Sequence, residues 1–85
     1  MKQITIDCSA IHNPGEFHAA LKAALSFPEW YGNNLDALHD CLTAITEETE
    51  LVLENFLGLD GFSRGFARVF ADTSLENPSL TITLS

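Results

Sequence analysis

Residues 28 to 43 read Pro28-Glu29-Trp30-Tyr31-Gly32-Asn33-Asn34-Leu35-Asp36-Ala37-Leu38-His39-Asp40-Cys41-Leu42-Thr43. Gly32 and Asn33 favour a turn, and Asn34 has the side-chain oxygen that caps the first turn of a helix. We therefore expect a helix to begin near Leu35. At about 100° per residue, its two faces differ in character: an apolar face of Leu35, Leu38, Leu42 and Ile45, and a polar face of Asp36, Asp40 and Thr43.

The polar face of this helix places two like charges one turn apart. Asp36 lies near the positive end of the helix dipole, but Asp40 lies too far along the helix to gain from it. Repulsion between the two carboxylates costs a few tenths of a kcal/mol, roughly. The arrangement suits a surface that binds cationic groups, and a solvated acidic face without a partner is the alternative.

The chain has 85 residues, which is enough for one domain, 1–85, with a modest core. Its 46% content of apolar residues argues against disorder, and it has neither a long apolar run nor a basic leader. We therefore expect a soluble, cytoplasmic protein that does not contact a membrane. Cys8 and Cys41 are expected to be reduced thiols, with Cys41 packed beside the leucine face.

Acidic residues outnumber basic residues by twelve to four, giving a formal net charge of -8. Lys22 and Arg64 bracket the stretch 23–63, which contains eight carboxylates and no Lys or Arg. Such a surface repels phosphates, so nucleic acid is disfavoured as a partner, and it attracts basic proteins. An acidic composition that serves only solubility is the alternative.

The remaining patterns predict an α/β domain with a small three-stranded parallel sheet and about three to four helices. Strands are expected at 2–7, 51–53 and 80–84, and helices from Pro14 to Leu25 and from Phe62 to about Leu75. The run 51–53 is apolar throughout, which predicts a middle strand buried on both faces. His18 borders the core face of the first helix, so a structural hydrogen bond is expected for it.

The spacings argue against an enzyme, a metal site and a cofactor site. His39 and Cys41 lie about 200° apart around one helix, so they cannot form a nucleophile and base pair. Asp36 and Asp40 lack the apolar pocket that would raise a carboxyl pKa, and no further oxygen ligands accompany them for a hard cation. No glycine-rich phosphate loop is present.

The stretch 28–43 closely resembles the signature of the barstar family, whose members are intracellular inhibitors of secreted ribonucleases. The similarity extends over nearly the whole chain, from Ile4, Phe17, His18 and Leu21 through 51–54 to 80–85, and the segment 56–65 is shorter by about one helical turn. The resemblance implies the barstar fold and a cytoplasmic antitoxin or immunity function. It also implies a free monomer that binds a basic ribonuclease or a related nuclease toxin.

The resemblance further implies which residues contact the nuclease. Asp40 matches the carboxylate that takes the place of a substrate phosphate among arginines and a catalytic histidine. Asp36 matches a second contact carboxylate, and Trp30 matches a tyrosine that packs on that histidine. The other matched contact positions are Asn34, Thr43, Ala44, Glu47 and Asp72.

This chain departs from the family pattern at His39, where barstar has tryptophan, and at Ala44 and Ile45, which replace a glycine and a tryptophan. The target nuclease can therefore differ from barnase. A barstar-like module that binds a protein other than a nuclease is the alternative function. His39 is interpreted as an exposed histidine without a role, with weak pH dependence as the alternative.

Overall fold

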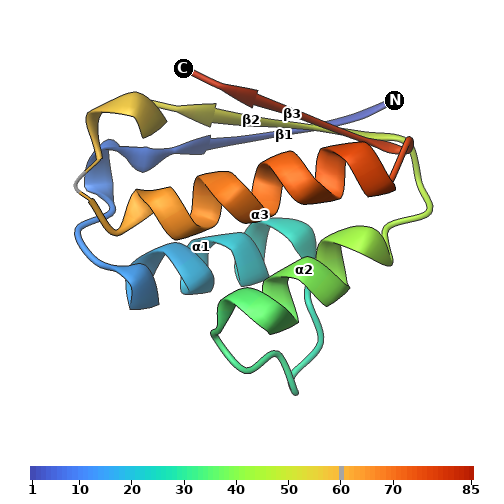
Figure 1. Cartoon of the computed structure of the whole chain (residues 1–85), viewed down its shortest axis with the longest axis horizontal. Helices are drawn as coiled ribbons and strands as arrows, with labels where there is room; N and C mark the ends of the chain where they lie inside the picture. Colours follow the sequence, from blue (N-terminus) through green and yellow to red (C-terminus); the bar gives the residue numbers. More distant parts are fainter. Residues whose placement is uncertain (60) are drawn as a thin grey trace.

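The computed structural model describes residues 1–59 and 61–85, which form a three-stranded sheet with helices stacked on one of its faces (Figure 1). The elements are β1 (Lys2–Asp7), α1 (Pro14–Leu25), α2 (Leu35–Thr43), β2 (Thr49–Glu54), α3 (Ser63–Glu76) and β3 (Leu80–Leu84). Short 3-10 turns, η1 (Cys8–Ala10) and η2 (Phe56–Gly58), follow the first two strands. The predicted α/β class is therefore confirmed. Asp60, within the segment expected to be shortened, lies outside the described residues.

All three strands run parallel in the order β1-β2-β3. Ile4, Leu51 and Ile82 lie side by side across the sheet, and this register places alternate apolar side chains of the three strands on one face, with Val52 on the other. The predicted position of the second strand in the middle of the sheet is confirmed.

The prediction that β2 is buried on both faces is wrong. Leu51 and Leu53 are buried, but Glu50 and Val52 are only partly covered. The reason is that all three α-helices lie on the same side of the sheet (Figure 1), so none of the helices in the described part of the chain packs over the outer face. In this small domain α1 and α3 contact the sheet, and α2 packs against α3 in a further layer.

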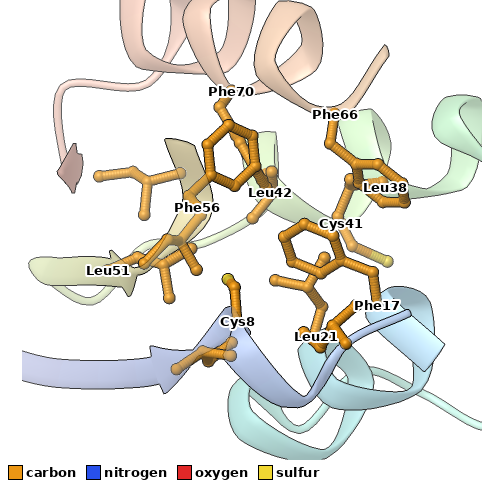
Figure 2. Packing of buried hydrophobic residues seen from close by; sticks show 14 of the residues in the cluster. Cys8, Phe17, Leu21, Leu38, Cys41, Leu42, Leu51, Phe56, Phe66 and Phe70 are labelled. Carbon is orange, nitrogen blue, oxygen red and sulfur yellow. The ribbon is translucent and has the colours of Figure 1, made fainter. Parts of the chain in front are cut away.

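Aromatic side chains fill the space between the sheet and the helices (Figure 2). Phe17 of α1 stacks on Phe66 of α3 with ring centroids 4.4 Å apart, and Phe56 and Phe70 lie about its edges. Cys8 and Cys41 are buried and unpaired, as predicted for reduced thiols. Burial raises the pKa of both thiols, so neither is an activated nucleophile.

Asparagine side chains cap the amino ends of two helices. Asn13 accepts a hydrogen bond from the Glu16 backbone N–H at 2.9 Å, and Asn34 accepts one from the Ala37 N–H at 2.8 Å. The start of α2 at Leu35 was predicted from this capping residue and is confirmed. In the part of the chain that the structure describes, no helix has the length and apolar character needed to cross a membrane.

Candidate functional site: the acidic face of α2

The acidic face of α2 is open to solvent. Asp36 and Asp40 are both exposed and lie one turn apart, as their spacing predicted. On the opposite side of the helix Leu38 and Leu42 are completely buried. Leu35 differs from the prediction, since it is 37% exposed: it lies at the first helical position and covers Gly65 of α3 instead of entering the core.

Tyr31 connects the loop before α2 to the protein core. Its hydroxyl lies 2.6 Å from Nδ1 of His18 on α1, and both side chains are buried. Burial raises the pKa of Tyr31 to about 12 and lowers the pKa of His18, so both groups are neutral in their hydrogen bond at pH 7. The predicted structural hydrogen bond of His18 is confirmed. It fixes the loop while the neighbouring Trp30 stays 70% exposed.

A shallow pocket of about 230 Å³ lies between this loop and α2. Trp30 and Phe27 line it from the loop, and Asp40, Ala44 and Ile45 line it from α2 and the residues after it. Three of the residues matched to contact positions, Trp30, Asp40 and Ala44, therefore meet at one place. The apolar wall formed by Phe27 and Ile45 was not predicted, because residues 18 positions apart give no local signal of contact.

The remaining matched residues differ in which hydrogen-bonding groups of their side chains stay available to a partner. Asn34 uses its amide for the helix cap and donates weakly to the Gly32 carbonyl at 3.3 Å. Thr43 donates back to the His39 carbonyl at 2.9 Å, which leaves its hydroxyl oxygen as an acceptor. Glu47 is exposed in the loop after α2 and lines a second hollow together with Ala44.

Asp72 lies on α3. It is exposed and lies one turn before Glu76, whose Oε2 atom is 2.5 Å from Nε2 of His39 on α2. His39 also lies close to Asp40, with 3.9 Å between Nδ1 and Oδ1. The interpretation of His39 as a residue without a role missed the contact with Glu76, which comes from a position 37 residues later in the chain.

Comparisons with known proteins identify the family of this chain. A family model described as Barstar (barnase inhibitor) matches residues 1–76. The chain belongs to the barstar family. One relative is a Bacillus subtilis (strain 168) protein named "Putative ribonuclease inhibitor YrdF". The two sequences are 44% identical over 77 residues, which cover 89% of this chain and 80% of that protein.

Membership of the barstar family confirms the resemblance inferred from residues 28–43 and makes a ribonuclease the expected kind of partner. A larger pocket of this barstar-family chain, about 400 Å³, lies beyond the carboxyl end of β1, next to Cys8 and Asn55. It lies away from the acidic face of α2 and shares no lining residue with the pocket beside Trp30. Among residues 1–59 and 61–85, every buried side-chain polar atom has a hydrogen-bond partner, so no unpaired group there points to a ligand.

Proposed function

We propose that this protein is a non-enzymatic, cytoplasmic inhibitor of a basic ribonuclease, of the antitoxin or immunity type. It acts as a monomer and inserts α2 and the preceding loop into the active site of the nuclease. Family membership and the name of the Bacillus subtilis relative support the inhibitory role. The target is barnase or another basic nuclease toxin.

The observation that carries the proposal is the exposure of Asp36 and Asp40 on one helix face beside an exposed Trp30. A carboxylate and a phosphate accept the same fork of hydrogen bonds from a guanidinium group. Asp40 therefore takes the place of a substrate phosphate among the basic side chains of the cleft. Trp30 supplies a flat apolar ring for a catalytic imidazole to pack on.

The other residues of the surface complete the contact. Asp36 is a second carboxylate for the basic cleft, and Glu47 and Asp72 extend the acidic surface at its edges. Ala44 contributes a small side chain that allows close backbone approach, and Thr43 offers its hydroxyl oxygen as an acceptor. Asn34 acts chiefly by starting the helix, since its amide oxygen already accepts the Ala37 N–H.

Replacing Asp40 by alanine tests this function directly. We expect the variant Asp40→Ala to bind barnase less tightly than the wild-type chain by about 3 kcal/mol or more, because the basic groups of the cleft would then be buried without a partner. Isothermal titration calorimetry measures the loss, and an assay of RNA hydrolysis measures the matching loss of inhibition.

Glu54→Ala is the matched control, because Glu54 is exposed at the end of β2 and alternates along the strand with the buried Leu51 and Leu53. It should bind like the wild-type protein. A change below about 0.5 kcal/mol for Asp40→Ala would remove Asp40 from the proposed role, since exposed residues outside an interface give effects of that size. A wild-type chain that leaves barnase fully active would contradict the proposal for barnase.

A further inference from the structure

His39 lies in the acidic surface and touches carboxylates of two helices. Nε2 is 2.5 Å from Glu76 Oε2 of α3, and Nδ1 is 3.9 Å from Asp40 Oδ1 of its own helix. The imidazole is about one third exposed and lies beside Asp40 on α2, the helix that the proposed partner would cover. It therefore links the packing of α2 on α3 to the carboxylate proposed as the phosphate mimic.

His39 is also the only residue between 23 and 63 whose side chain can take up a positive charge near neutral pH, because that stretch has no Lys, no Arg and no other His. The other histidines lie elsewhere: His12 contacts Glu16 at the start of α1, and His18 is buried against Tyr31. The other charged residues of these two helices are Asp36 and Asp40 on α2, and Arg64, Arg68, Asp72 and Glu76 on α3. Of these, Glu76 and Asp40 form the contacts with His39 given above.

We infer that His39 makes binding of the basic nuclease depend on pH. When the imidazole takes up a proton, a positive charge lies beside Asp40 and pairs with Glu76. The imidazolium then adds a positive charge to the acidic surface where the cationic cleft would dock, and it repels the basic groups of that cleft. The neutral imidazole removes this repulsion and still holds Glu76 by a hydrogen bond.

The direction of the pH dependence follows from linkage. A cationic partner prefers the neutral imidazole, so binding displaces the proton from His39. Affinity should therefore increase as pH rises and fall as pH drops. This inference rests on the proposed function, because it concerns the same surface and the same partner.

Two substitutions that fix the charge of residue 39 provide the test. His39→Asn keeps a polar, neutral side chain, and His39→Lys keeps a permanent positive charge. With barnase as the probe, we expect the wild-type chain to lose about five- to tenfold more affinity than His39→Asn between about pH 7.5 and about pH 5.5. His39→Lys should bind more weakly than His39→Asn at both pH values.

His12→Gln is the matched control, since His12 also contacts a carboxylate, 3.2 Å away, but at the amino end of α1. It should keep the pH profile of the wild-type chain. Groups of barnase that titrate contribute equally to all variants, so only differences between variants count. Equal pH profiles for the wild-type chain and His39→Asn would overturn the inference, and a large loss of binding by Asp40→Ala in the same experiment would show that the proposed function still stands.

Discussion

At the scale of single residues, the pair of His18 and Tyr31 shows how a buried group supports an exposed one. The two rings meet under the loop, and the 2.6 Å hydrogen bond satisfies both polar ends in an apolar setting. Phe27 packs against Tyr31 from the same loop, with ring centroids 4.9 Å apart. Trp30 can therefore stay exposed for a partner without the loop having to order itself on binding, which lowers the entropic cost of association.

Burial of His18 predicts that the protein is less stable at mildly acid pH. Burial lowers the pKa of His18 in the folded state, so the unfolded chain binds a proton more readily. Above about pH 6.5 both states are neutral at this residue and stability is unaffected. As pH falls below that value, the unfolded state is favoured by up to about 1.4 kcal/mol per pH unit.

Urea unfolding at about pH 7.5 and about pH 5.5 measures the effect. The wild-type chain should lose more free energy of unfolding on acidification than His18→Gln, which cannot take up a proton. Parallel losses in the two proteins would mean that His18 does not contribute to the pH dependence of stability.

At the scale of elements, one side chain at the end of α3 forms hydrogen bonds with the carboxyl end of α2. Asn77 is buried, and its amide nitrogen donates to the carbonyls of Leu42 and Ile45, both at 2.9 Å. Its amide oxygen accepts the backbone N–H of Ser79 at 3.0 Å. One residue thus bonds two carbonyl groups at the carboxyl end of α2, where the Leu42 carbonyl also accepts the Ile45 N–H at 3.4 Å, and it sets the turn into β3.

Replacing Asn77 by alanine should cost about 2 to 3 kcal/mol of unfolding free energy, because the carbonyls of Leu42 and Ile45 and the N–H of Ser79 would each lose a hydrogen bond. Asn13→Ala is a useful comparison, since it removes one capping bond at an exposed helix end and should cost about 1 kcal/mol. Chemical denaturation of both variants gives the two values. If Asn77→Ala were no more destabilising than Asn13→Ala, the link between α2 and α3 would lie elsewhere.

The same elements show what the sequence could predict. The start of α2 and the shared face of Asp36 and Asp40 follow from one capping residue and from helical spacing, which are local properties. The partial exposure of Val52 could not be predicted, because an apolar run does not reveal how many layers of helix cover a sheet. Contacts such as His39 with Glu76 join residues 37 positions apart and leave no mark on local periodicity.

At the scale of the whole molecule, the sheet and the helices form layers, and the acidic face of α2 lies on the outermost layer (Figure 1). The sheet lies at one side, its helices cover one face, and α2 with its loop forms the layer farthest from the sheet (Figure 1). A partner that approaches α2 meets Asp36, Asp40 and Glu47, all exposed, on a chain of net charge -8. Under the proposed function, this arrangement should speed the approach of a basic nuclease by electrostatic steering.

The position of the charges, beyond their number, should then control the association rate. Two double variants remove the same charge from opposite sides: Asp36→Asn with Glu47→Gln on the α2 side, and Glu50→Gln with Glu54→Gln on the outer face of the sheet. At low ionic strength, about 20 mM, the α2-side variant should associate with barnase several-fold more slowly than the wild-type chain, and the sheet-side variant should change by less than about twofold. Stopped-flow fluorescence measures both rates, and at about 500 mM salt the difference should largely disappear because the Debye length shrinks to a few ångströms. Equal slowing in the two variants would mean that net charge alone steers the partner, and slowing in the sheet-side variant only would move the docking surface away from α2.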